Sequence, residues 1–305
     1  MYIGSRKQDF KKLIEKLLKI GDMNINSIEN LLDDHSMKIY GQIFTHPSVN
    51  EELNYEAFEL AGDVTLNKAI VWYFLRRFPQ LNCPKGVKVI TRLKIRYVSK
   101  KAFADFGKQL GFWEFISASE EVRSKEMKPT LEDVFEAFIG VTEYLIDTKI
   151  GLSVGYSVCY NIVKALFDKV KISLKYEDLY DSITRLKETQ DYWNSLEGRE
   201  KWKQINSNTP FGRLVYENER VIDKETGFSI QYVTIYRINV KKEKKVMGNV
   251  TREIKITTKL AVLAKASAAL LPDAKQKAAL IALENLKQYG QTKPKDPYYY
   301  NLDKL

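Results

Sequence analysis

NYEAFELAGDVTLN, at residues 54–67, decides the predicted fold, because it places acids within an apolar helix. Its acids, Glu56, Glu59 and Asp63, are three and four residues apart, so a helix presents all three on one face. The Phe, Leu, Val and Ala residues between them predict that this helix is buried. Buried carboxylates are costly unless they are neutral, paired with cations or bound to a metal ion.

A second acidic stretch, LEDVFEAFIGVTEYLID, lies at residues 131–147. Asp133 and Glu136 repeat the three-residue step among equally apolar neighbours. Neither stretch contains a cluster of Arg or Lys that could neutralise these acids. The sequence therefore favours a metal site where the two helices pack together.

The length and charge of the chain limit the kind of protein to which that site can belong. The chain has 305 residues, 44% of them hydrophobic, which is enough for two ordinary domains with cores. Residues 1–180 hold 26 Lys and Arg against 24 Asp and Glu (net +2), and residues 181–305 hold 23 against 15 (net +8), which gives the total of +10. This basic C-terminal part indicates an acidic partner, although charge alone does not single out nucleic acid.

Cysteines and apolar runs indicate the compartment. Cys83 and Cys159 are far apart and lack metal-ligand spacing, so neither a disulfide framework nor a zinc site is predicted. No long uninterrupted apolar run occurs, and the N-terminus lacks the apolar core of a secretory leader. We therefore expect a soluble, intracellular protein, in the cytoplasm or the nucleus.

The segments around the acidic stretches are predicted to be helical as far as residue 170. Pro47 breaks the helical pattern in the turn THPS, where His46 is more typical of a structural residue than of a catalyst. Residues 87–116 have helical spacing, and residues 117–130 have the composition of a surface loop. The basic positions in and just before residues 87–116 fit a solvated surface as well as a contact with an acidic partner: Lys85, Lys88, Arg92, Lys94, Arg96, Lys100 and Lys101.

Together the two acidic stretches resemble the two signature regions of the ribonuclease III family. The first signature is a helix of the type N-E-x-x-E-F-L-G-D after a T-H-x-S turn, and the second is a helix of the type D-x-x-E-A-x-x-G. The intervening segments match in order and spacing, so the resemblance covers about residues 30–170. The matching residues are Thr45, His46, Pro47, Ser48, Glu56, Glu59, Gly62, Asp63, Asp133, Glu136, Ala137 and Gly140.

The resemblance implies which residues do the chemistry. Glu59, Asp63, Asp133 and Glu136 would be metal ligands, with Glu136 the most sensitive to removal and Glu56 in a supporting role. Two-metal hydrolysis of a phosphodiester needs several oxygen ligands, which favour Mg²⁺, with Mn²⁺ as a substitute.

The role of Lys128 is open, and three other positions depart from the family's pattern. Lys128, just before the second acidic helix, could neutralise the scissile phosphate or be a plain surface lysine. Ala57, Leu60 and Ala61 replace the family's usual Arg, Phe and Leu. In the family that Phe plugs a pocket of the partner subunit, so the implied homodimer would have to form with Leu60 in its place.

The second half changes its pattern. A helix over residues 175–193 precedes three antiparallel strands between residues 213 and 266, and a last helix opens at Pro272 and ends at Gly290. This order resembles a double-stranded RNA-binding domain, the usual C-terminal companion of ribonuclease III. A polar insertion over residues 194–210 has no counterpart in that resemblance.

The predicted architecture has two domains. It is an all-α N-terminal ribonuclease III-like domain over residues 1–172 and an α+β (α-β-β-β-α) C-terminal double-stranded RNA-binding-like domain over residues 173–290. Residues 291–305 are predicted to be a flexible tail.

Lysines in the second half are candidates for contacts with RNA, because A-form RNA is recognised mainly by shape and phosphates. The lysines between the second and third strands fit a solvated hairpin tip equally well. The candidates are Lys241, Lys242, Lys244 and Lys245 in that hairpin, and Lys275 and Lys277 at the start of the last helix.

These observations predict a metal-dependent endoribonuclease that cleaves double-stranded RNA by two-metal hydrolysis, as a homodimer, leaving short 3′ overhangs and 5′-phosphates as the family does. One rival is a catalytically silent protein that only binds double-stranded RNA. Another is a structural subunit of an RNA–protein complex that docks through the surface around Leu60. Retention of every motif acid argues against the loss of catalysis.

Overall fold

The computed structural model describes residues 1–205, 209–222, 227–247 and 250–302, without the side chains of residues 243–254. The chain divides into two compact units, Met1–Ser173 and Leu174–Leu305, and each is described by itself. No described helix is both long enough and apolar enough to span a membrane.

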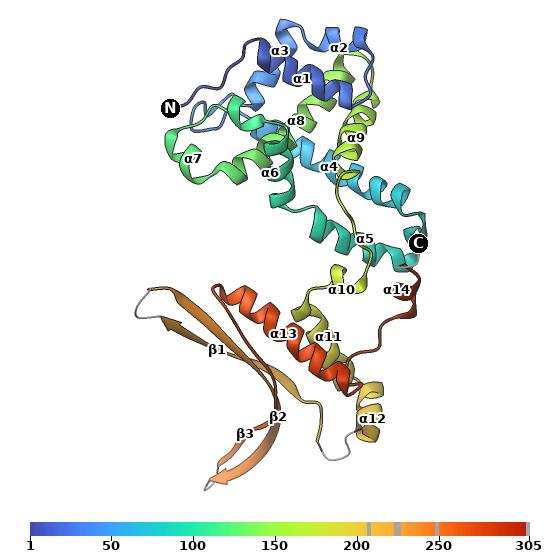
Figure 1. Cartoon of the computed structure of the whole chain (residues 1–305), viewed down its shortest axis with the longest axis vertical. Coiled ribbons are helices and arrows are strands. Elements are labelled where there is room, and N and C mark those ends of the chain that lie inside the picture. The colour runs from blue at the N-terminus through green and yellow to red at the C-terminus, as the bar shows by residue number, and fades with distance from the viewer. Residues whose placement is uncertain (206–208, 223–226, 248–249, 303–305) are drawn as a thin grey trace. The chain divides into compact units, whose positions relative to one another are not determined.

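The first unit is helical, as predicted (Figure 1). The long helix α8 (Met127–Lys149) packs against α4 (Glu56–Arg77), α6 (Lys100–Gln109) and α9 (Val154–Phe167). Its other elements are α1 (Gln8–Ile20), α2 (Ile25–Leu31), α3 (Asp34–Ile43), η1 (Pro79–Leu81), α5 (Pro84–Tyr97), η2 (Phe112–Phe115) and α7 (Glu120–Lys125).

Helix α8 is central because it is apolar on almost every side. Val134, Phe135, Phe138 and Ile139 are all fully buried, and consecutive buried positions of this kind are typical of a helix enclosed by others. The Phe135 ring lies 5.6–6.5 Å from three further phenylalanine rings of α6 and η2. The acids of α8 therefore come from a helix that packing holds in place.

Two predictions for this unit need correction. The helical segment over residues 87–116 is interrupted at Val98 and Ser99, where Ser99 caps α6 by accepting a hydrogen bond from the Ala102 amide. The predicted loop over residues 117–130 contains α7 and the first turn of α8. Its serine and acidic residues start α7, with Ser119 as the N-cap, which explains why the stretch looked like a loop.

The second unit contains a three-stranded antiparallel sheet in the order β1-β2-β3, with α11 (Ser182–Asn194) and α13 (Leu271–Gln288) packed together and against the strands (Figure 1). The strands are β1 (Arg213–Ile222), β2 (Ser229–Met247) and β3 (Val250–Ala268). The helix, three strands and helix appear in the predicted order, so the predicted fold class is confirmed. The short helix α10 (Tyr176–Leu179) precedes α11.

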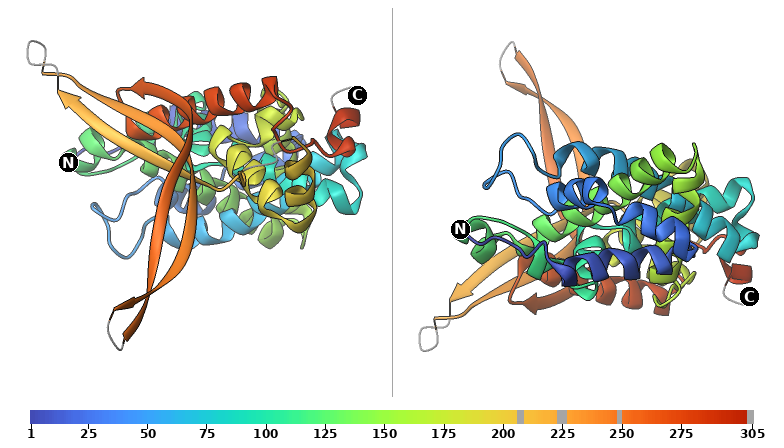
Figure 2. Two further views of the ribbon diagram at one scale, coloured as in Figure 1. Left: turned by 90° about the horizontal axis from the view of Figure 1, so that it is seen from below. Right: turned by 90° about the horizontal axis from the view of Figure 1, so that it is seen from above.

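The hairpin of β2 and β3 is longer than the rest of the sheet. β1 pairs with β2 only from Ser229 to Ile238, whereas β2 and β3 stay paired as far as Met247 and Val250. Figure 2 shows the two strands continuing beyond β1 as a ribbon. Lys241 and Lys242 lie on this ribbon, and both are exposed.

The predicted polar insertion is part of the core of this unit. It forms α12 (Leu196–Ile205), whose Trp202 is buried 5.1 Å from the Trp193 ring and 5.2 Å from the Phe211 ring. The Arg237 guanidinium lies 4.8 Å from the Trp202 ring centre, and its Nε donates to the Phe211 carbonyl. One tryptophan among charged residues therefore anchors the segment.

The C-terminal tail also differs from the prediction as far as it is described. Helix α14 (Pro297–Leu302) buries Tyr299 and Leu302. The Tyr299 hydroxyl lies 2.8 Å from the Tyr180 hydroxyl, and the Tyr176 ring packs edge-on against the Tyr299 ring. Three tyrosines hold this part of the tail, so the prediction of a flexible segment is wrong for α14.

Candidate active site

Two glycines let α4 and α8 approach closely. A Cβ on Gly62 would overlap the main-chain carbonyl of Glu136, and a Cβ on Gly140 would overlap the carbonyl of Phe58. The two helices therefore touch backbone to backbone, because neither position carries a side chain. This crossing brings the acids of both helices to one place.

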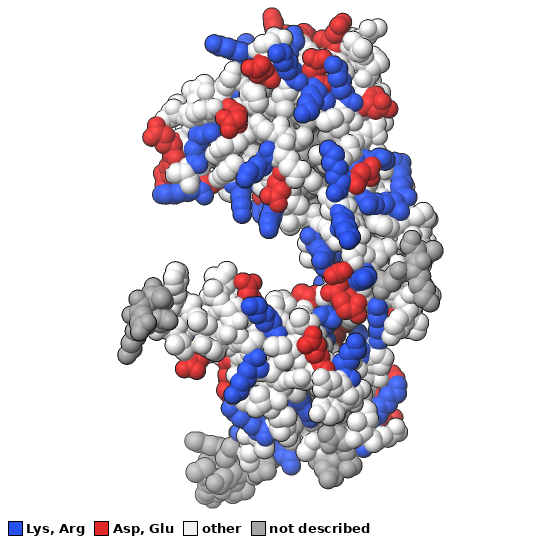
Figure 3. Space-filling view, in the orientation of Figure 1, with Lys and Arg blue, Asp and Glu red and all other residues white. Residues whose placement is uncertain are grey.

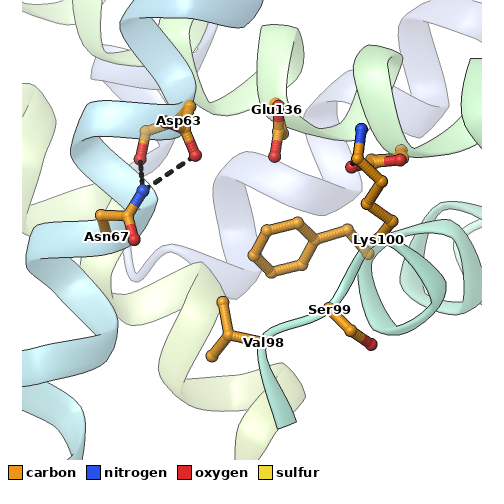
Figure 4. A pocket seen from close by; sticks show the side chains of 8 residues that line it. Asp63, Asn67, Val98, Ser99, Lys100 and Glu136 are labelled. Carbon is orange, nitrogen blue, oxygen red and sulfur yellow. Dashed lines mark hydrogen bonds and ion pairs between the residues drawn. The ribbon is translucent and has the colours of Figure 1, made fainter. Parts of the chain in front are cut away.

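Acids of both α4 and α8 line one pocket of about 320 Å³. Figure 4 shows Asp63 of α4 and Glu136 of α8 on two facing helices, with Lys100 of α6 on the other side. Glu136 is buried, Asp63 is exposed at the pocket, and the Asn67 side-chain amide donates to Asp63 Oδ1 at 2.8 Å. The lining residues are Asp63, Asn67, Val98, Ser99, Lys100, Phe103, Glu132 and Glu136.

Carboxyl groups gather at this crossing. Burial, and then the Asp63 carboxylate, raise the pKa of Glu136 to about 8. Burial and Asp133 raise the pKa of Glu59 to about 7. Burial also raises the pKa of Asp133, although the Tyr55 hydroxyl and Lys100 oppose the rise. These carboxylates stand close enough together to resist ionisation, which is the electrostatic setting that a cation relieves.

The four predicted metal ligands share this neighbourhood in different ways. Asp63 and Glu136 line the pocket, whereas Glu59 and Asp133 are half-buried beside it and do not line it. Within the described part of the chain, no three Asp, Glu, His or Cys side chains are arranged closely enough to hold a metal ion. Glu56, expected to support them, is exposed at the start of α4.

Asp133 is held by residues of the segment before α4. The buried Tyr55 donates its hydroxyl hydrogen bond to Asp133 Oδ2 at 3.2 Å. The His46 ring packs edge-on against the Tyr55 ring, and His46 Nδ1 lies 2.9 Å from Ser48 Oγ. The THPS turn thus supports the tyrosine that orients this acid.

The sequence prediction did not place two charged residues, Glu132 and Lys100, at the pocket. Lys100 Nζ lies 3.2 Å from Glu132 Oε1, and burial raises the pKa of Glu132 although Lys100 lowers it. Glu132 precedes Glu136 by four residues, and this step alone could have placed both on one helix face. Lys100 was one of many basic positions, and no local pattern distinguished it from them.

The predicted basic residues lie in several places. Lys128 is exposed in the first turn of α8 and does not line the pocket. Lys275 and Lys277 lie in the first part of α13, where Lys275 is half-buried and Lys277 is exposed. The Lys244 and Lys245 side chains fall outside the described residues. Figure 3 shows Lys and Arg gathered over α5 and α6 in the view drawn, where the sequence has its dense basic stretch.

Comparison with known proteins gives consistent matches to one family. Residues 56–144, from the start of α4 into α8, match the family described as "Ribonuclease III domain". The chain is 40% identical over 228 residues to a protein of Invertebrate iridescent virus 6 named "Putative ribonuclease 3", which covers 71% of this chain and 78% of that protein.

Two further matches are shorter. A protein of Frog virus 3 (isolate Goorha), also named "Putative ribonuclease 3", is 41% identical over 191 residues, covering 62% of this chain and 51% of that protein. The chain thus spans about half the length of this second relative. A solved structure of the nuclease domain of ribonuclease III from Campylobacter jejuni matches 51% of this chain and 99% of that chain, at 23% identity and a TM-score of 0.38.

Proposed function

Because this chain belongs to the ribonuclease III family of endoribonucleases, we propose that it cleaves double-stranded RNA with the help of divalent cations, Mg²⁺ or Mn²⁺. One observation carries the proposal. The close contact of Gly62 with Glu136 brings carboxylates from both signature helices to one pocket. A cluster of acids with raised pKa values lowers the stability of the fold. Its presence is therefore better explained by a role in phosphodiester hydrolysis than by a structural role.

The donor chemistry of the pocket fits a hard cation. Asp63 and Glu136 offer carboxylate oxygens, which Mg²⁺ and Mn²⁺ prefer over nitrogen and sulfur ligands. Glu59 and Asp133, half-buried beside the pocket, would complete the ligand set of a bound cation. Bound cations would lower the pKa of the attacking water and stabilise the charge on the leaving oxygen.

The protein's own residues prepare that site. The Tyr55 hydroxyl fixes the orientation of Asp133, and the Asn67 amide fixes that of Asp63. The glycine contact keeps α4 and α8 in register, so the carboxylates do not have to be rearranged by helix movement. Such preorganisation is the usual contribution of a protein to phosphoryl chemistry.

We also infer a homodimer. Leu60 and Val64 stand one turn apart on α4 with 74% and 64% of their surfaces exposed. Apolar side chains that gather on an otherwise charged surface indicate a protein partner. Leu60 would occupy the place of the family's phenylalanine in the contact between two copies.

The second unit would bind the duplex. Its helix, three strands and helix carry exposed lysines on the β2–β3 ribbon, at Lys241 and Lys242, and near the start of α13, at Lys277. Lysines spread over a ribbon and a helix start can follow phosphates without reading sequence. This inference therefore concerns affinity for duplex RNA, and the pocket of the first unit determines cleavage.

A cleavage assay tests the proposal. Long double-stranded RNA is incubated with the full chain, with Mg²⁺ or with EDTA, beside Glu136→Gln and the control Glu121→Gln on the exposed surface of α7. We expect short fragments with 5′-phosphates from the unmutated protein and the control, only with metal. Intact RNA in every reaction, together with metal-independent binding, would instead identify a silent RNA-binding protein.

A further inference from the structure

Lys100 stands at the same pocket as the acids. It is the first residue of α6 (Figure 4). Its Nζ lies 3.2 Å from Glu132 Oε1. The two side chains differ in their surroundings, because 86% of the lysine side chain is exposed against 6% of the glutamate side chain. The ammonium group thus reaches from solvent onto a fixed, buried carboxylate.

One lysine lines the pocket beside three acids. Among the described residues that line it, Lys100 is the one cation, beside the carboxylates of Asp63, Glu132 and Glu136. Lysine has four rotatable bonds, so this exposed side chain can exchange partners without moving α6. When cations neutralise the acids, the attraction that holds Lys100 on Glu132 weakens and the ammonium becomes available at the mouth of the pocket.

Lys128 is the alternative lysine. The sequence places it just before the second acidic helix, but it is exposed and does not line the pocket. Lys100 is 33 positions before Asp133 in the chain, and only the packing of α6 against α8 brings it to the acids. Position therefore favours Lys100 over Lys128 as the group that meets a phosphate at this site.

We propose that Lys100 binds a non-bridging oxygen of the phosphate that is cleaved, after exchanging Glu132 for that phosphate. This inference rests on the proposed function and adds a substrate contact to it. An ammonium at a phosphate oxygen stabilises the negative charge that grows during hydrolysis, so the contact strengthens in the transition state. After cleavage the same contact holds the 5′-phosphate of the product.

A structural role for Lys100 predicts different behaviour. In that case the lysine only neutralises the buried Glu132, and its removal harms the enzyme because an unpaired charge is left behind. Removing Glu132 as well would then cancel the defect. A substrate contact predicts instead that Lys100 matters whether or not Glu132 is present, and the two roles separate in a double-mutant cycle.

The first experiment measures kcat and KM for a short RNA duplex with Lys100→Ala, Lys100→Arg and the control Lys101→Ala, which is exposed and does not line the pocket. We expect Lys100→Ala to lower kcat by about 10- to 100-fold with little change in KM, and Lys100→Arg to retain part of the rate. The same loss should appear when Lys100→Ala is added to Glu132→Gln. An unchanged kcat, or a loss that Glu132→Gln cancels, would overturn the inference while leaving the proposed function intact.

The second experiment does not need catalysis. In the Glu136→Gln background, we measure the affinity for a product duplex that ends in a 5′-phosphate and for one that ends in a 5′-hydroxyl. We expect the phosphate to be preferred several-fold, and Lys100→Ala to remove that preference while Lys101→Ala keeps it. A preference that survives Lys100→Ala would assign the phosphate to another group. Failure of the unmutated chain to cut RNA would overturn the proposed function, and with it the inference that rests on it.

Discussion

Gly62 of α4 faces the main-chain carbonyl of Glu136 so closely that no Cβ fits between them. The same helices meet again where Gly140 faces the carbonyl of Phe58. The two glycines of the signature motifs are therefore spacing residues. They set how close two acidic helices can come, and so they determine the positions of Asp63 and Glu136 without any chemistry of their own.

Gly62→Ala should harm both stability and cleavage. The added methyl group must push α4 away from α8, and overpacking of this kind costs about 1–3 kcal/mol of unfolding free energy. Urea unfolding measures that loss, and the cleavage assay under folded conditions should show a further loss as the acids separate. The control is Ala61→Ser, at the adjacent exposed position. Full stability of Gly62→Ala would mean that the helices are not in backbone contact.

Glu136→Gln should abolish cleavage but stabilise the metal-free protein. The folded-state pKa of Glu136 is raised to about 8, whereas a glutamate in an unfolded chain titrates near 4.3. Above pH 8 the native state must hold a buried charge, and glutamine removes it. We expect a gain on the order of 2–4 kcal/mol, measured by urea unfolding in EDTA at pH 8.5. A loss of stability there would mean that the carboxylate makes favourable contacts without metal.

The stability of the metal-free protein should fall as pH rises. With the pKa values of Glu59 and Glu136 raised to about 7 and about 8, the folded chain binds more protons than the unfolded chain between about pH 4.5 and 8. Stability from these groups is therefore fully present at low pH and is lost through that window. Thermal melts from pH 5 to 9 in EDTA should show the fall, apart from the effects of other titrating groups.

Added Mg²⁺ should reverse most of that fall, because metal binding displaces protons from the same carboxylates. Repeating the pH series on Glu136→Gln provides the control, since one of the two titrating acids is gone. A pH series that is identical with and without Mg²⁺ would argue against a metal at these residues.

Sequence reasoning identified the acids because three- and four-residue steps on a helix are visible without coordinates. The helices, the strands and the acidic face of α4 were all predicted from such local periodicity. The Lys100–Glu132 pair was not predictable, because it forms only when α6 packs on α8 across more than thirty residues of chain. Trp202 was hidden for a similar reason, since one buried aromatic residue within a polar stretch leaves no periodic pattern.

Tyr55→Phe should weaken metal binding while leaving the fold intact. It removes the hydroxyl that donates to Asp133 Oδ2 at 3.2 Å but keeps the buried ring. Partners that orient a metal ligand typically change metal affinity by about 10- to 100-fold. We therefore expect a higher Mg²⁺ concentration for half-maximal cleavage and a near-normal rate at saturating metal. Tyr144→Phe, on the exposed surface, is the control, and an unchanged metal requirement would contradict an orienting role for Tyr55.

The exposed lysines of the β2–β3 ribbon should determine how strongly salt weakens RNA binding. Each lysine that neutralises a phosphate releases counterions, so replacing Lys241 and Lys242 with glutamine should lower the slope of log affinity against log salt by about 2. Binding of the cleavage-inactive Glu136→Gln chain to a duplex, measured from 50 to 300 mM salt (roughly the range in which such contacts dominate), gives that slope. Lys203→Gln, at an exposed position of α12, is the control. Because cleavage chemistry resides in the other unit, kcat at saturating RNA should stay unchanged in the double variant. An unaltered slope would mean that the ribbon is a solvated hairpin and that the duplex is held elsewhere.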